Sequence, residues 1–196
     1  MFKRLSLSAA LLTAATAPAF AHLDPLAHGS FAAGLTHPIF GADHVLAMVA
    51  VGLWATQIAS QSGRRSALWI VPASFVGTMA LGFFAAVLGV QLPFVEPAIL
   101  ASVIGLGLLV ALAVRVPLAA SAAIVGIFAL FHGHAHGAEL GAAGALQFGL
   151  GFIAATALLH LAGVLLGISV SRAAPSITRA AGAITALAGL SLAFGG

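Results

Sequence analysis

Histidine is the residue type with the most chemistry to offer in this chain, which has eight histidines among 196 residues and no cysteine. A chain without cysteine forms no disulfide and has neither a thiolate metal ligand nor a cysteine nucleophile. The metal ligands that remain are imidazole, carboxylate and thioether groups, and imidazole suits zinc, copper and nickel. The spacing of the histidines therefore indicates where the chain could bind a divalent ion.

The first histidine group lies in the segment HPIFGADHVLAM, residues 37–48. Because proline is favoured in the first turn of a helix, the sequence predicts that Pro38 begins a helix capped by His37. Side chains at steps of four, three, four and four then share one face. That face carries His37, Gly41, His44, Met48 and Gly52. Asp43 lies beside it, either as a direct ligand or as the acceptor of a hydrogen bond from a ligating imidazole. The alternative is that these histidines only cap and pack a helix end, and Met48 alone is more often a packing residue.

The second histidine group lies in the segment FHGHAHGAE, residues 131–139. In an extended loop His132, His134 and His136 would point to one side, whereas in a helix His132 and His136 would pair. Both geometries allow chelation, with Glu139 as a harder ligand. The alternative is a solvated histidine-rich loop that binds metals weakly and without selectivity.

Two further positions lie outside these groups. His160 stands among leucines in an apolar segment, and an ionisable side chain at membrane depth usually lines a pathway. It is predicted to serve a transport path or a proton relay, the alternative being a hydrogen bond to a neighbouring helix. His22, with Asp24 and His28 nearby, would begin a processed chain, where its amine and imidazole could chelate a divalent ion together.

The elements that must position these side chains are apolar. Hydrophobic residues make up 62% of the chain and charged residues 6%, whereas a soluble domain has about 25% charged residues. The composition predicts an all-α polytopic membrane protein embedded in the lipid bilayer. The net charge of +3 comes without a basic run, which excludes a nucleic-acid partner. The oligomeric state stays open.

The N-terminus has the pattern of a signal peptide. Lys3 and Arg4 precede an apolar stretch, residues 5–17, and Ala19-Phe20-Ala21 is an A-x-A-like cleavage site. We expect residues 1–21 to be a cleaved signal peptide and residues 22–196 to form a single transmembrane helical bundle domain. An uncleaved anchor helix is the alternative, and in both cases the chain after Ala21 begins outside the cytoplasm.

Six segments are apolar and long enough to cross a bilayer. Residues 26–36 are apolar but too short to span it, and they are expected to form a half-helix or a re-entrant segment. The predicted spans are residues 43–59, 67–88, 98–114, 118–131, 142–170 and 180–194. The spacing G-x-x-x-G at residues 163–167 predicts close helix packing, either within one bundle or between two copies.

The positions of the charged residues support one membrane topology for these spans. With the first span entering from outside, every arginine beyond the signal peptide falls on the cytoplasmic side, as the positive-inside rule requires. These are Arg64, Arg65, Arg115, Arg172 and Arg179. The same topology places Asp24, Glu96 and residues 132–139 outside. The sequence thus predicts six spans in a bacterial cytoplasmic membrane, with both ends outside.

Taken together, the signal peptide, the segment HPIFGADHVLAMVAVG at residues 37–52, the segment FHGHAHGAE and the six spans resemble the HupE/UreJ family of nickel and cobalt permeases. The resemblance covers essentially the whole chain and is most specific at residues 37–52. It implicates His37, Asp43 and His44 in metal transport, with a second group at His132, His134, His136 and Glu139. The separate nickel/cobalt transporter family carries H-x4-D-H, whereas here five residues separate His37 from Asp43.

The resemblance implies a secondary permease that imports Ni2+ or Co2+ for the maturation of a metalloenzyme such as hydrogenase or urease. The metal is then a substrate, and no prosthetic group is expected. No phosphate-binding loop is present, so the membrane potential would supply the driving force. The alternatives are a membrane metal-binding or sensor protein and a histidine-dependent membrane enzyme, although the H-x-x-H clusters of membrane di-iron enzymes are absent. The choice among nickel, cobalt and zinc, and between uniport and proton coupling, stays open.

Overall fold

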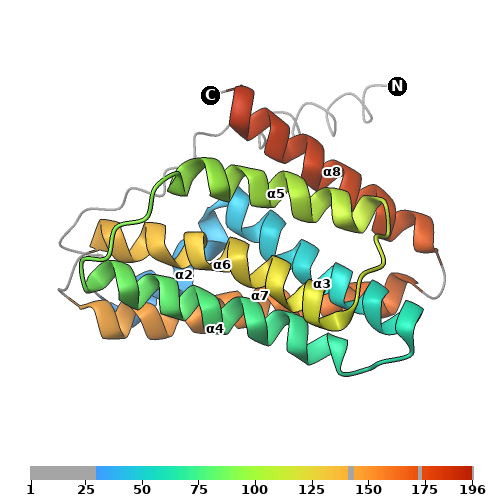
Figure 1. The fold of residues 1–196 in the computed structure, drawn as a ribbon, viewed down its shortest axis with the longest axis horizontal. Coiled ribbons are helices and arrows are strands. Elements are labelled where there is room, and N and C mark those ends of the chain that lie inside the picture. The colour runs from blue at the N-terminus through green and yellow to red at the C-terminus, as the bar shows by residue number, and fades with distance from the viewer. Residues whose placement is uncertain (1–29, 141–143, 172–173, 196) are drawn as a thin grey trace, which may run out of the picture.

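The computed structural model describes residues 30–140, 144–171 and 174–195, which fold into helices without any strand in that part of the chain. The helices lie alongside one another along the long axis of the molecule (Figure 1). Their bounds are α2 Phe31–Phe40, α3 Ala42–Ser62, α4 Ala67–Val87, α5 Val95–Ala111, α6 Leu118–Leu140, α7 Ala145–Ser171 and α8 Pro175–Phe194.

Five of these helices, namely α3, α4, α6, α7 and α8, are long and apolar enough to cross a membrane. Helix α5 is apolar too but has only 17 residues. The expectation of an all-helical chain with several helices of membrane-spanning length is therefore confirmed. The predicted signal peptide and its cleavage site lie outside the described residues, so they stay predictions.

The chain between residues 30 and 62 corrects one prediction. The Ser30 hydroxyl caps α2 by accepting a hydrogen bond from the Ala33 amide, 3.0 Å away. Pro38 lies inside the last turns of α2 and does not begin a helix, and Gly41 is extended with φ −88° and ψ 113°. Proline has no N–H to donate to the preceding turn, which weakens the helix there. The prediction of one helix that carries His37 to Gly52 on a single face is wrong, because the helix is interrupted at Gly41 and a new helix begins at Ala42.

Helix α6 corrects a second prediction. The fourth span was expected to end at residue 131, with the segment beyond it left open between a loop and a helix, and α6 in fact continues to Leu140. Glycine and histidine have low helix propensity, which is why this segment is typical of a loop. Here the glycines stabilise the helix through packing, since a Cβ at Gly133 would overlap the carbonyl oxygen of Met79 on α4. Tertiary contact therefore overrides local propensity.

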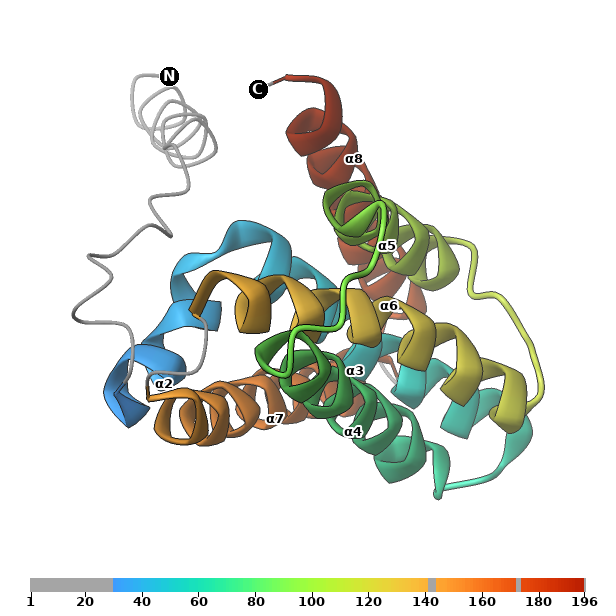
Figure 2. The same ribbon diagram turned by 60° about the vertical axis from the view of Figure 1, so that its left-hand side comes forward.

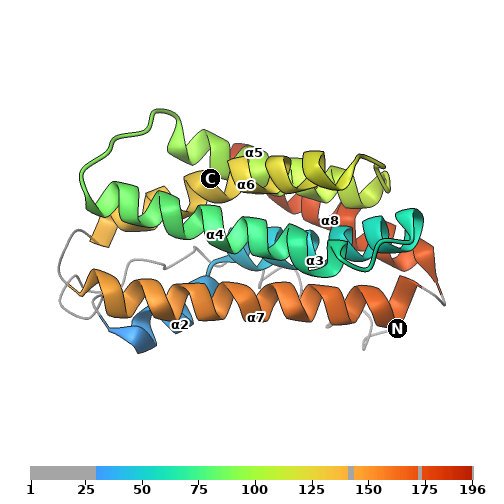
Figure 3. The ribbon, with the colours of Figure 1, turned by 60° about the horizontal axis from the view of Figure 1, so that its bottom comes forward.

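Close helix packing through glycine recurs between α3 and α7. A Cβ at Gly52 would lie 2.5 Å from the His160 carbonyl oxygen, and one at Gly167 would lie 2.7 Å from the Thr56 hydroxyl. Gly163 and Gly167 thus pack against α3 of the same chain, which is the intramolecular alternative for the G-x-x-x-G spacing. Figure 3 shows α7 running the length of the bundle with α2 beside its beginning, and Figure 2 shows α5 and α8 stacked together.

The two ends of the bundle differ in charge. The described acids lie in terminal turns of α3, α5 and α6, and they line one common cavity: Asp43, Glu96 and Glu139. We call this the histidine end, where α3 and α7 begin and α6 finishes. The opposite end carries the described arginines, Arg64, Arg65, Arg115 and Arg179. There Gln61 donates to the Ala113 carbonyl and Arg179 Nε donates to the Ala111 carbonyl, which holds the ends of α3 and α5 and the start of α8 together.

Candidate metal centre

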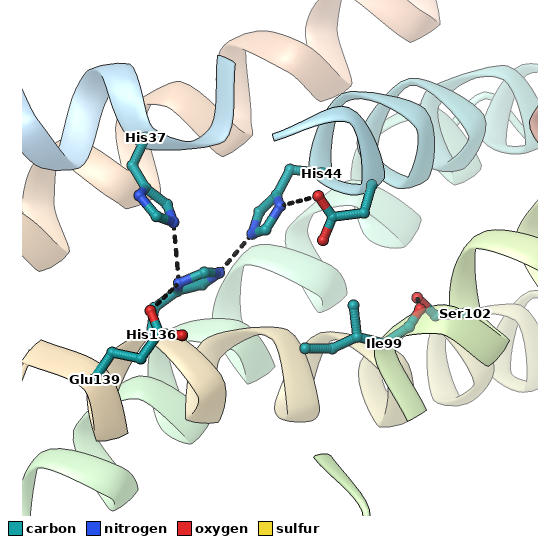
Figure 4. A network of polar contacts seen from close by, with 7 residues as sticks. His37, His44, Ile99, Ser102, His136 and Glu139 are labelled. Carbon is teal, nitrogen blue, oxygen red and sulfur yellow. Dashed lines mark hydrogen bonds and ion pairs between the residues drawn. The ribbon is translucent and has the colours of Figure 1, made fainter. Parts of the chain in front are cut away.

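Three imidazoles converge at the histidine end. His37 lies in the last turn of α2, His44 in the first turn of α3 and His136 near the end of α6. The two shortest contacts join His37 Nε2 to His136 Nδ1 at 3.1 Å and His44 Nε2 to His136 Nε2 at 2.5 Å. One ring nitrogen from each of the three residues lies within 4.8 Å of the other two. Figure 4 shows the three rings facing one another from three helices. We call His37, His44 and His136 the outer cluster.

The break at Gly41 makes this convergence possible. Because α2 and α3 are separate helices, His37 and His44 approach from two directions, and their ring centroids are 5.7 Å apart at an interplanar angle of 87°. A continuous helix would instead stack the two side chains along one face. His136 closes the third side because Gly133 and Gly137 seat α6 directly on the backbone of α4.

The hydrogen bonds around the outer cluster define where its protons lie. The Asp43 carboxylate can only accept, so His44 Nδ1 donates to Asp43 Oδ1 at 2.8 Å, which leaves a lone pair on Nε2 of the neutral ring. His136 Nε2 then donates to His44, and His136 Nδ1 accepts from His37 Nε2. The Glu139 side chain lies beside this series of hydrogen bonds, with its Oε2 3.6 Å from His136 Nδ1. Three neutral imidazoles thus satisfy one another when no ion is bound.

The same geometry suits a divalent ion. Ligand nitrogens around one ion lie at most about 4.2 Å apart when each metal–nitrogen bond is about 2.1 Å. The outer cluster already holds its nitrogens within 4.8 Å, so shifts of less than about 1 Å would complete a site. Asp43 orients His44 by the hydrogen bond that metal-ligating histidines commonly make to a carboxylate. Of the two sequence-based options for Asp43, this geometry corresponds to the hydrogen-bond acceptor.

A cavity of about 330 Å³ adjoins the outer cluster and gives an ion room to enter. Its wall includes His37, His44 and His136 together with Asp43, Glu96 and Glu139. A larger groove between α4 and α6 is lined mostly by small apolar residues, and the Ser74 and Thr78 hydroxyls in it donate to carbonyls of their own helix. Of these two cavities, the smaller one combines space with charge and metal ligands.

The second histidine group is divided among three positions. His136 joins the outer cluster, whereas His134 Nε2 donates to the Val90 carbonyl in the α4–α5 connection at 2.7 Å. His132 lies one turn deeper, completely buried, and its ring centroid is 5.6 Å from that of His44. The alternative of a solvated histidine-rich loop is wrong, since all three rings are buried within a helix whose glycines pack on α4.

The remaining predicted residues lie apart from the outer cluster. His160 is buried midway along α7, and its Nδ1 donates to the Thr156 carbonyl at 2.7 Å. Met48 is completely buried in the hydrophobic core. His22 lies outside the described residues, so its predicted role as a ligand stays a prediction.

Comparison with known proteins places the chain in a family. Residues 10–192 match the family described as "HupE / UreJ protein". The chain belongs to the HupE/UreJ family. It is similar to Protein HupE of Rhizobium leguminosarum bv. viciae, with 48% identity over 147 residues, which cover 74% of each chain. No solved structure matches it. The resemblance inferred from the sequence motifs is confirmed.

Sequence reasoning assigned Glu96 only to an outer loop and not to the candidate site. Glu96 lies in the first turn of α5, far from both histidine groups in sequence, yet it lines the same cavity. The available signal was charge, because Glu96 was predicted to share the outer face with residues 132–139. Whether Glu96 reaches this cavity depends on how α5 packs, and no local pattern reports that packing.

Proposed function

We propose that this HupE/UreJ family member is a secondary permease that imports Ni2+ or Co2+ across the cytoplasmic membrane for the maturation of a metalloenzyme such as hydrogenase or urease. The observation that carries the proposal is the outer cluster, whose three imidazole nitrogens lie within 4.8 Å beside a cavity lined by three carboxylates. Imidazole favours borderline divalent ions over calcium or magnesium. Family membership supports the same conclusion.

The proposed topology has six spans, with the histidine end outside and residues 1–21 removed as a signal peptide. It requires α5 to cross the bilayer, and a helix of 17 residues lies at the lower limit for doing so. The segregation of described arginines to the opposite end supports a cytoplasmic position for that end. Inward movement of a divalent ion then gains about 4.6 kcal/mol per 100 mV from the membrane potential.

Ion capture would begin with the carboxylates at the cavity, which raise the local concentration of cations. The entering ion replaces the hydrogen bonds that join the three histidines. His136 carries its proton on Nε2 in the ion-free hydrogen-bond network. To ligate through Nε2, it must carry the proton on Nδ1 instead, which faces Glu139 Oε2 at 3.6 Å. Asp43 keeps the His44 proton on Nδ1, so His44 Nε2 is ready to ligate without rearrangement.

Uptake of radiolabelled Ni2+ tests this function. Cells that express the chain should accumulate Ni2+ well beyond one or two ions per protein, and Co2+ should compete better than Zn2+ or Cu2+. His44→Ala should abolish this uptake, whereas the matched control Ser74→Ala, which removes a hydroxyl bound to its own helix, should not. Accumulation that stops at one or two ions per protein would contradict a permease and favour a metal-binding or sensor protein.

A further inference from the structure

Two histidines below the outer cluster carry a ring nitrogen that the fold leaves without a partner. His132 on α6 and His160 on α7 are 0% and 1% exposed. In both, Nε2 is buried and makes no hydrogen bond to any described residue. A buried polar atom without a partner destabilises a fold, so its presence in two neighbouring residues points to a ligand.

The hydrogen bonds of these two histidines define their tautomers. His132 Nδ1 bonds to the Phe128 carbonyl at 3.1 Å, and His160 Nδ1 bonds to the Thr156 carbonyl at 2.7 Å. A carbonyl oxygen only accepts, so each Nδ1 carries the proton and each neutral Nε2 presents a lone pair. Histidines that ligate metals typically have this arrangement, in which a backbone carbonyl holds the other ring nitrogen.

The two rings continue inward from the outer cluster. At a rise of about 1.5 Å per residue, His136 lies about 6 Å and His132 about 12 Å from the end of α6, and His160 lies midway along α7. The His132 ring contacts that of His44 with centroids 5.6 Å apart. The Phe75 ring on α4 contacts both histidines. Its centroid lies 5.7 Å from that of His132 and 4.9 Å from that of His160.

We infer that His132 and His160 form a second, deeper binding site for a borderline divalent cation, which receives the ion from the outer cluster. The inference rests on the proposed permease function and names the next ligands on its route. One turn from His160 along α7, the Thr156 hydroxyl donates a hydrogen bond to the Met79 thioether at 3.5 Å.

The deeper site binds its ion more weakly than the outer cluster does. Its assigned donors carry no charge, whereas Asp43 and Glu139 adjoin the outer cluster. A carboxylate that faces a ligating imidazole strengthens binding, and conduction requires successive sites that release the ion. An ion therefore dwells at the outer cluster and passes His132 and His160 on its way inward.

His160→Leu tests the inference in two ways. The first is flux of Co2+ into proteoliposomes that hold an inside-negative potential. We expect the flux to fall roughly tenfold or more because the route loses a ligand. The second is titration of the purified full chain with Co2+, followed by visible absorption. We expect wild type to bind two equivalents and His160→Leu to lose the weaker one. Its outer affinity should stay within about twofold of wild type, because the ring contact of His160 is with Phe75 and not with a residue of the outer cluster.

Controls separate a lost ligand from a damaged fold. Leucine removes the unpartnered nitrogen, so the thermal midpoint of His160→Leu should not fall below that of wild type. His160→Gln, which keeps a side-chain acceptor, should recover part of the flux. Ser121→Ala changes another buried residue, bonded to the Pro117 carbonyl near the start of α6, and should transport normally.

The outcomes distinguish the inference from the function on which it rests. If wild type transports Co2+ and His160→Leu transports it equally well and still binds two equivalents, the deeper site is overturned and the permease stays intact. A wild-type chain that binds two equivalents without moving them would instead overturn the permease. Acidification of the vesicle lumen that depends on His160, with Co2+ binding unchanged in His160→Leu, would overturn the cation site in favour of a proton carrier.

Discussion

Replacing Asp43 by asparagine should weaken metal binding without unfolding the chain. The Asp43 carboxylate accepts from His44 Nδ1 at 2.8 Å and so directs the Nε2 lone pair toward the outer cluster. An asparagine can still occupy this position, but it has no charge, and its NH2 group can face Nδ1 and force the His44 proton onto Nε2. Both changes oppose ligation by His44.

The size of this effect follows from the geometry. The carboxylate lies about 7 Å from an ion on His44 Nε2, given the 2.8 Å hydrogen bond, the ring width and a metal–nitrogen bond of about 2.1 Å. Removing one charge from a divalent ion at that distance costs about 1.2 kcal/mol in water and about 4.7 kcal/mol at an effective dielectric constant of about 20. The Asp43 side chain is 25% exposed, so we expect the lower half of this range, about 1.4 to 2.8 kcal/mol. That corresponds to an increase in Kd of about 10- to 100-fold.

Isothermal titration of the purified chain with Ni2+ measures this increase. The comparison needs wild type, Asp43→Asn and Asp43→Ala, each with its thermal midpoint recorded in the absence of metal. A Kd for Asp43→Asn within about twofold of wild type would refute the reasoning, since even a water-screened charge contributes more. If Asp43→Asn restores none of the affinity that Asp43→Ala loses, the charge and not the shape of the acceptor is decisive.

Three further predictions test the site and its orientation. Gly41→Ala should impair Ni2+ uptake with little loss of thermal stability, because the added Cβ would lie 2.7 Å from His44 Nδ1 and 3.0 Å from Asp43 Oδ1; normal uptake would contradict the positioning of the pair. Imidazole ligates only as the neutral base, so acidification should lower initial uptake at limiting Ni2+, and added metal should restore it. Acid stimulation at both low and high metal, with the potential clamped, would instead indicate proton symport. Reporter fusions after Arg65, Arg115 and Arg179 should give a cytoplasmic signal and a fusion after Glu139 an external one, and an external signal after Arg115 would exclude six spans.

The uneven use of the second histidine group illustrates how far sequence reasoning reaches. Spacing alone left two geometries open, and the helical one is correct, yet even that pattern groups His132 with His136. In the fold they occupy different levels, because each successive turn of α6 faces a different neighbour: His136 meets His37 from α2, whereas His132 meets Phe75 from α4. His134, between them, turns to the α4–α5 connection.

The sequence by itself determined the properties that depend on composition and local pattern. Low charge and long apolar segments predicted the membrane helices, the arginines predicted a charge asymmetry between the two ends, and the motifs at residues 37–52 and 131–139 predicted the family. Only the tertiary structure decided which ligands meet. His37 and His136 are 99 residues apart in the chain. They are in contact because α2 ends at Phe40, before Gly41, and because glycines let α6 pack closely against α4. Such contacts depend on how remote helices pack, which no short-range periodicity records.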